Sequence, residues 1–213
     1  MGNLSLSLST QNWWIFLGLA LAVGAFGFAF YFIKKYRDEI APKKRVTRND
    51  HDSSVKALKK ILGSYVRRND GRVIYSIEVG SKKTQGSADA ILIGYFGVLV
   101  LVGCALSGEL YANDKDEKLT QIVKQERRQH ENPVIQSITA GKAVAELLRE
   151  KKVYKIQVES AVVFTNKKAT PNVPASLKSY RPKTLRKALK SDRFLEDKGV
   201  DTDAAAEAIL SWR

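Results

Sequence analysis

The chain has 213 residues with a formal net charge of +14 at pH 7, and 44% of them are hydrophobic, enough for one core of ordinary domain size. The single cysteine, Cys104, excludes an internal disulfide and is compatible with a reducing compartment. The two histidines, His51 and His130, are isolated and lack the spacing of zinc ligands. All charged side chains occur from Lys34 onward. That part of the chain should therefore attract polyanions such as nucleic acid or anionic lipid, unless it is merely a soluble basic surface.

An uncharged apolar segment runs over residues 12–33, and a helix needs about 20 residues to cross the hydrocarbon layer. Its ends carry Trp13, Trp14 and Tyr31, aromatic residues that prefer the headgroup zone. A cleaved signal peptide would have positive charges before a shorter apolar run, whereas here the charges follow it. We therefore expect a single-pass membrane protein with an extracytoplasmic tail over 1–11 and a transmembrane helix over 12–33 in the lipid bilayer.

The charges after the span predict its orientation. Basic residues follow it directly at Lys34, Lys35, Arg37, Lys43, Lys44, Arg45 and Arg48. The positive-inside rule then places the N-terminus outside and the C-terminal domain in the cytoplasm. This juxtamembrane linker, residues 34–52, is also suited to anionic lipid headgroups. Within the span, Gly18 and Ala22 have the small-residue spacing that allows two helices to pack closely, so a homodimer through these positions is possible.

The next segment has the pattern of a helix followed by strands. Apolar residues recur at helical spacing from Val55 to Val66, with Asp52 or Ser53 able to cap the helix. Strands are expected at 73–79, 90–93, 98–102 and 109–112, and their close spacing suggests an antiparallel meander. The charged segment 114–132 has no apolar periodicity and is expected to be a loop or an exposed helical turn.

The second half continues with a helix, a strand and a helical tail. Helical spacing extends from Pro133 to Arg149, and a strand follows at 156–164. In the tail, Pro182 is suited to a first helical turn, and Asp201 or Thr202 is able to cap a further helix. The order αβββ(β)αβ with terminal helices predicts an α/β fold, an α+β mixed sheet flanked by helices.

Two stretches carry a resemblance to a known family. The segment 89–111 reads DAILIGYFGVLVLVGCALSGELY, and NPVIQ follows at 132–136. Together they resemble the nuclease-related domain family, NERD, which is similar to the restriction-endonuclease-like nucleases. The resemblance implies a restriction-endonuclease-like domain over 53–166 and leaves a basic, helical C-terminal extension over 167–213.

The resemblance also implies a site. In the family an Asp, a Glu and a Lys hold a divalent metal ion and orient the attacking water, and a Gln opens the next helix. Asp89 stands at the position of the metal-binding Asp and Gln136 at that of the Gln. Val102 and Cys104 occupy the Glu and Lys positions, and the first helix, 53–68, contains no carboxylate. The Glu-x-Lys motif is therefore degenerate, and one carboxylate is too few to hold a magnesium ion tightly.

Simpler roles remain open for these residues. Asp89 can cap the turn into a strand, Gln136 can cap a helix, and Cys104 resembles a small buried hydrophobe more than a nucleophile. Glu78 and Glu109 lie on expected strands, and either would serve as a relocated metal ligand in an active enzyme. No cofactor is expected, and Mg²⁺ or Mn²⁺ would be needed only if the domain were active.

Basic side chains gather on the first helix and in the C-terminal segment. They are Lys56, Lys59, Lys60, Arg67, Arg68, Arg181, Lys183, Arg186, Lys187, Lys190 and Arg193. The leading hypothesis is a membrane-anchored, catalytically inactive NERD-like domain that acts in nucleic-acid binding or assembly at the cytoplasmic membrane face. The alternatives are a metal-dependent nuclease with a relocated carboxylate, and a membrane-organising protein that binds lipid headgroups or a protein partner.

Overall fold

The computed structural model describes residues 24, 28, 50–80 and 84–212. The chain divides into two compact units, Met1–Arg45 and Val46–Arg213. The expected tail, most of the expected span and the basic juxtamembrane cluster lie outside the described residues, although Gly24 and Phe28 are helical. Among the residues that are described, no helix has the length and apolar character needed to cross a membrane.

The second unit begins with helix α2, His51–Val66, which confirms the helix predicted after the linker. Its N-cap is Asp50, whose side chain accepts a hydrogen bond from the backbone N–H of Ser53 at 3.2 Å. The expectation of a cap at Asp52 or Ser53 was therefore wrong. Three polar residues that favour caps lie close together here, and the one that precedes the first turn is the one that meets the free N–H groups.

A five-stranded sheet forms the centre of this unit, with the strand order β1-β2-β3-β7-β9. Its strands are β1 Arg72–Gly80, β2 Gln85–Gly94, β3 Gly97–Cys104, β7 Val158–Phe164 and β9 Ser179–Tyr180. The first three are antiparallel, as the predicted meander requires. β7 then pairs parallel with β3, and β9 pairs parallel with β7. Each of these parallel pairings needs a crossover connection, and the long helix before β7 provides the one from β3 to β7.

A second sheet with the order β6-β5-β4-β8 corrects two expectations. Its strands are β4 Gly108–Tyr111, β5 Lys118–Val123, β6 Glu126–Glu131 and β8 Ala169–Asn172. β4 thus exists but does not continue the meander, and the loop predicted at 114–132 is a β-hairpin. The apolar alternation of β5 is concealed because Gln121 is fully buried beside Leu119, and its side chain is satisfied by donating to the Ser107 carbonyl at 2.7 Å.

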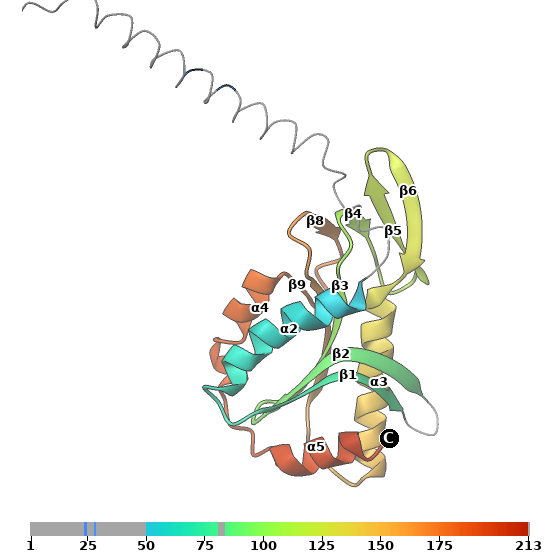
Figure 1. Cartoon of the computed structure of the whole chain (residues 1–213). Coiled ribbons are helices and arrows are strands. Elements are labelled where there is room, and N and C mark those ends of the chain that lie inside the picture. The colour runs from blue at the N-terminus through green and yellow to red at the C-terminus, as the bar shows by residue number, and fades with distance from the viewer. Residues whose placement is uncertain (1–23, 25–27, 29–49, 81–83, 213) are drawn as a thin grey trace, which may run out of the picture. The chain divides into compact units, whose positions relative to one another are not determined.

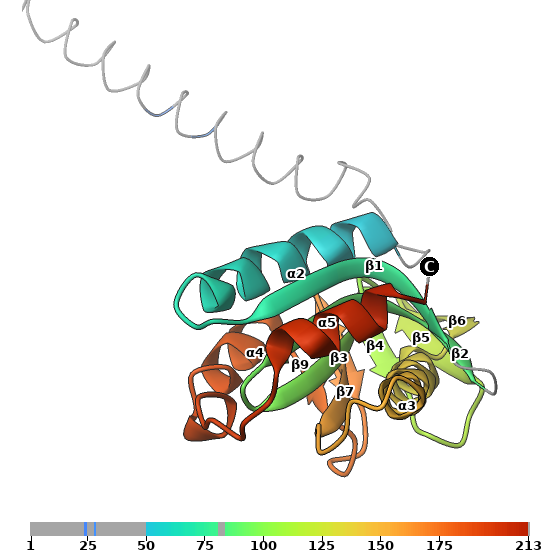
Figure 2. The same ribbon diagram turned by 90° about the horizontal axis from the view of Figure 1, so that it is seen from below.

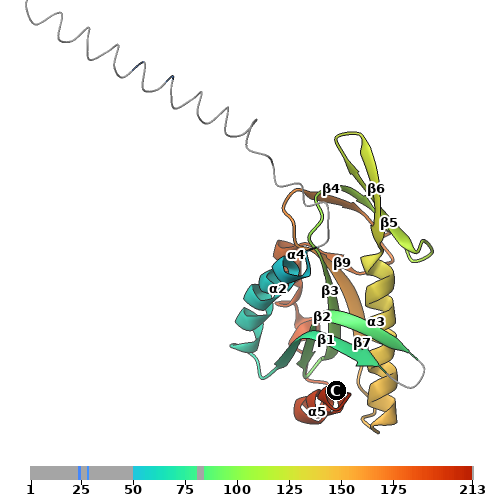
Figure 3. The same ribbon diagram turned by 45° about the vertical axis from the view of Figure 1, so that its right-hand side comes forward.

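Helices cover both faces of the five-stranded sheet, and Figure 3 shows α2 and α3 on opposite sides of β3. One face carries α2 and α4, Pro182–Ala188, and the other carries α3, Pro133–Glu150, with α5, Thr202–Leu210, beside it. Pro182 opens α4 and Asp201 caps α5, as predicted. A short 3₁₀ turn, Asp192–Phe194, lies between these two helices. A mixed α/β fold with sheets flanked by helices is therefore confirmed, although the C-terminal segment expected to be helical also supplies β8 and β9.

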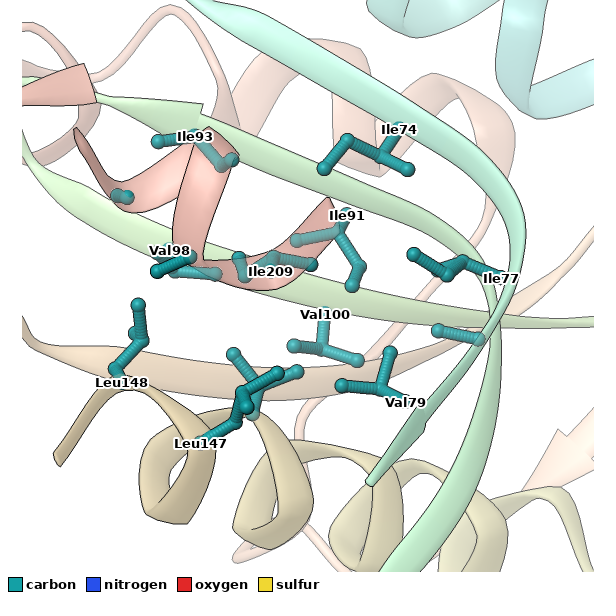
Figure 4. Close-up of a cluster of buried hydrophobic side chains, with 14 of the residues drawn as sticks. Ile74, Ile77, Val79, Ile91, Ile93, Val98, Val100, Leu147, Leu148 and Ile209 are labelled. Carbon is teal, nitrogen blue, oxygen red and sulfur yellow. The ribbon is translucent and has the colours of Figure 1, made fainter. Parts of the chain in front are cut away.

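The core consists of three apolar clusters. The largest lies between the sheet, α3 and α5 and includes Ile91, Val100, Leu147 and Ile209 (Figure 4). A second fills the space under α2 and α4. The third lies where β3 and β7 end and includes Cys104. All three clusters are built from residues of the Val46–Arg213 unit, so this unit has a core of its own.

Candidate functional site

Asp89 lies where the ladder between β2 and β3 stops. The register of the two strands runs from Gly94, opposite Gly97, to Ala90, opposite Leu101. The side chain of Asp89 then continues the connection, because its Oδ2 accepts a hydrogen bond from the backbone N–H of Gly103 at 2.6 Å. Only 5% of Asp89 is exposed. A buried carboxylate with a short bond to a backbone N–H is a strong structural link between two strands.

The second oxygen of this carboxylate is occupied by a histidine. Asp89 Oδ1 lies 2.8 Å from Nδ1 of His51, the first residue of α2, and the His51 side chain is 56% exposed. The same helix packs tightly at Gly103, where a Cβ atom would come within 2.5 Å of the Ser54 Cβ. Asp89 therefore connects β2, β3 and the first turn of α2, and both of its oxygens are held by donors from the protein.

The positions of the family's Glu and Lys lie in apolar surroundings. Val102 is buried and pairs with Val162 of β7. Cys104 is also buried, and it packs with Leu106 and Phe164 in the third cluster. Burial is the main cause that raises the pKa of the Cys104 thiol to about 11, so it remains a protonated thiol at neutral pH. Neither side chain can act as an oxygen ligand or as a cation.

The Asn-Pro-x-x-Gln segment has a structural role at the start of α3. Asn132 caps the helix, because its Oδ1 accepts from the Val134 N–H at 3.0 Å. Its Nδ2 donates to the carbonyls of Asn113 and Asp116, which fixes the preceding loop against the helix. Gln136 donates to Glu131 at 2.9 Å. The amide of Gln136 is thus directed to the hairpin that precedes α3.

Glu78 and Glu109 come from different sheets. Glu78 is exposed on β1 and lies in register with Ser87, two residues along β2 from Asp89. Glu109 is exposed on β4 of the second sheet and accepts a hydrogen bond from the Tyr111 hydroxyl at 2.8 Å. Within the described residues, no group of three or more His, Cys, Asp or Glu side chains is placed to hold a metal ion.

The residues around Asp89 therefore do not fit the divalent metal ion that the family resemblance implies. Magnesium requires several oxygen ligands in near-octahedral geometry. Here the available carboxylate already bonds His51 and Gly103, and its neighbours on β3 are a valine and a protonated thiol. This arrangement is suited to holding strands and helix together.

A basic groove of about 750 Å³ lies on the other half of α2, between that helix and α4. Figure 1 shows the two helices side by side on the same face of the sheet. α2 and the turn after it contribute Lys60, Arg67 and Arg68. α4 and the turn after it contribute Lys183, Arg186, Lys187 and Lys190. All seven side chains are exposed, and none of the described residues that line the groove is acidic.

The groove brings together the two basic groups that were separate in the sequence. Seven of the eleven basic residues singled out in the sequence line it, and the exceptions are Lys56, Lys59, Arg181 and Arg193. The ammonium of Lys59 lies instead over the ring of Tyr75, 5.4 Å from its centroid. The sequence showed which residues are basic but not that they form two facing walls, because this depends on the packing of α4 against α2 across more than 100 residues of chain.

The sequence did not indicate that His51 contacts Asp89. It lacks a partner at the spacing of a metal site, and its partner Asp89 lies 38 residues further along the chain. The available signal was its place just after a capping aspartate, at the start of the first helix.

Comparisons with known proteins agree with the resemblance. The family model described as nuclease-related domain, NERD, matches residues 52–165, more than half of the chain. No curated protein and no solved structure gives a significant match. The matched segment contains Asp89 and all of α2 except its first residue, His51, but it ends before α4, so one wall of the basic groove lies outside it.

Proposed function

Since the chain belongs to the NERD family of nuclease-related domains, we propose that it is a catalytically inactive member that binds nucleic acid at the cytoplasmic face of a membrane. The observation that carries this proposal is the groove between α2 and α4. Seven exposed cations line a single concave surface without an acidic neighbour among the described lining residues. Such a surface attracts phosphates and concentrates a polyanion close to it.

The surroundings of Asp89 support the loss of catalysis. Hydrolysis of a phosphodiester by this family's chemistry needs carboxylates that hold a metal ion and a base that activates water. Asp89 is bonded to His51 and Gly103, while Val102 and Cys104 are both buried. We therefore expect no cofactor, and the domain acts by holding nucleic acid without cutting it.

The sequence before Asp50 supports the membrane part of the proposal. An uncharged apolar segment over 12–33 followed by seven basic residues has the pattern of a single-pass anchor with its C-terminal side in the cytoplasm. Close packing at Gly18 and Ala22 would allow a homodimer, and the juxtamembrane cations would add affinity for anionic headgroups. The anchor would keep bound nucleic acid at the membrane.

One pair of assays tests this function. The purified chain in a non-ionic detergent is incubated with labelled DNA and RNA, single-stranded and duplex, in magnesium or manganese, and binding is measured in parallel by fluorescence anisotropy. We expect binding that weakens with salt and no cleavage. Cleavage that is lost in Asp89→Ala would show an active enzyme. If cleavage is also lost in the separate variant Glu78→Ala or Glu109→Ala, that residue is the relocated ligand. Absence of binding at low salt would refute the nucleic-acid role.

A further inference from the structure

We propose that the basic groove binds one unpaired strand of nucleic acid in preference to a duplex. This inference rests on the proposed function and specifies its ligand. It depends on three properties of the groove: the spacing of the cations along its two walls, its size, and the apolar surface between the walls.

The cations form two short stripes of similar length. On α2 they extend from Lys60 to Arg68, and on the opposite wall from Lys183 to Lys190. At a rise of about 1.5 Å per residue these stripes are roughly 10–12 Å long. Consecutive phosphates of one strand lie at least about 3.4 Å apart along the axis, so each wall can contact about two or three of them. Because the walls face each other across one groove, both can contact the same short run of phosphates.

The size of the groove favours a single strand. Its volume of about 750 Å³ lies within the range of small-ligand pockets, roughly 300–1,000 Å³. A short segment of one strand is of this scale. A duplex is much wider, since its major groove alone measures about 12 Å across. A duplex could therefore reach only the outer tips of the lysines and arginines, leaving the space between the helices unfilled.

The apolar surface between the walls points to the same ligand. Ile61 and Leu189 are buried beneath the cations, while Leu195 lines the groove with 51% of its surface exposed. A duplex presents charged phosphates outward and keeps its bases stacked inside. An unpaired strand presents sugars and base edges as well, which can cover Leu195. Tyr65, the only aromatic residue among the described lining, is buried, so we expect little stacking and little preference for base composition.

The groove is also held in shape without a ligand. The Tyr65 hydroxyl of α2 donates to the Phe194 carbonyl at 2.6 Å, and the rings of Phe96 and Phe194 pack edge to face with centroids 4.8 Å apart. The Arg181 guanidinium donates to the Ala169 carbonyl at 3.0 Å, which fixes the start of α4. Because both walls are already positioned, binding does not have to order them, and this lowers the entropic cost of binding.

The test compares a fluorescent 20-nucleotide oligothymidylate with a 20-base-pair duplex carrying the same label. The full chain is used in a non-ionic detergent, and anisotropy is measured over a range of salt. Oligothymidylate is chosen because it forms no stable secondary structure. We expect it to bind at least about tenfold more tightly than the duplex. Its affinity should fall with salt with a slope of about −0.7 per phosphate contacted on log axes.

Three variants examine the groove. The first reverses Arg186, Lys187 and Lys190 to Glu on one wall, and the second reverses Lys60, Arg67 and Arg68 to Glu on the other. Each should reduce the slope by about two units, since three contacts are removed. The third, Leu195→Asn, should weaken oligothymidylate binding about fivefold without changing the slope, because it removes an apolar contact and no charge.

A matched control changes the same charge elsewhere. Lys118, Lys142 and Lys167 are exposed and do not line the groove. Reversing all three to Glu changes the net charge as much as either wall variant, so binding that depends on overall charge alone would fall equally. The basic residues before Asp50 are the same in the parent chain and in every variant, so their contribution to binding cancels in the comparison. Circular dichroism and thermal melting verify that each variant is folded.

The outcomes distinguish a failure of the single-strand preference from a failure of the proposed nucleic-acid binding. If the duplex binds as tightly as the single strand and both wall variants weaken it, the preference is refuted while nucleic-acid binding remains. If neither nucleic acid binds, both proposals fail. If micelles containing phosphatidylglycerol displace the oligonucleotide from the groove at lower concentration than unlabelled oligonucleotide does, the groove is a lipid site and the inference is overturned.

Discussion

Replacing Asp89 by alanine tests whether this residue is a structural anchor. The change removes the hydrogen bond that Asp89 accepts from the backbone N–H of Gly103 and the bond to His51. The lost hydrogen bond to a charged acceptor costs about 1.5–3 kcal/mol of unfolding free energy. The histidine is half exposed, so its pair adds at most about 1 kcal/mol. The total is about 2–4 kcal/mol, which in a domain of this size lowers the melting temperature by roughly 5–12 °C.

Urea unfolding of the Val46–Arg213 unit, followed by far-UV circular dichroism, measures this loss. The unit contains all three apolar clusters and is the appropriate fragment. Asp89→Asn should retain one acceptor oxygen and lose about half as much stability as Asp89→Ala. Asp114→Ala, at an exposed position, should stay within about 0.5 kcal/mol of the parent. A stability of Asp89→Ala equal to that of the Asp114 control would refute the anchoring role.

Three further predictions follow from single residues. Burial lowers the pKa of His130, whose Nε2 lies 2.8 Å from Oε1 of Gln121. The stability that neutral His130 contributes is therefore present above the ordinary pKa of 6.5 and is lost as the pH falls through the lower pKa of the folded state. His130→Asn should flatten the decline in unfolding free energy on acidification, measured by urea titration at several pH values. Cys104, with its raised pKa, should react with a thiol reagent at pH 8 only after denaturant is added, and reaction at the rate of a free thiol in the folded state would contradict its burial. An impermeant maleimide applied to intact cells should label a cysteine placed at Ser5 and spare one placed at Ser176, whereas the reverse pattern would contradict the proposed orientation.

The elements that could be predicted from the sequence are those whose periodicity reflects burial directly. α2 and α3 each present one apolar face to the sheet, so their spacing shows in the sequence. In β2 and β3, successive apolar residues are all buried, so both sheet faces are covered there and the sequence shows a continuous apolar run. The hairpin β5–β6 has neither property. Its turn at Lys124 and Gln125 has positive φ at both residues but contains no glycine or asparagine, so its turn chemistry is absent from the sequence.

The two candidate sites could also be predicted from the sequence only in their local features. The resemblance to a family could identify Asp89, because its motif is local. It could not show that both oxygens are occupied, because His51 and Gly103 reach Asp89 from a helix and a strand that are distant in the chain. For the groove, the number of cations was evident in the sequence, but their convergence depends on Tyr65 of α2 bonding the turn after α4. Long-range packing of this kind has no sequence period.

α2 serves two separate surfaces. Its first turn meets Asp89, and its second half forms a wall of the groove that begins about 14 Å further along the helix, at Lys60. A substitution at Asp89 therefore alters contacts at the start of the helix and none of the side chains that line the groove. The second wall, α4, follows the segment shared with the family. Under the proposed function, the degenerate positions lie on β3 and the groove is formed by α2 and α4, so the two properties belong to different elements of one fold.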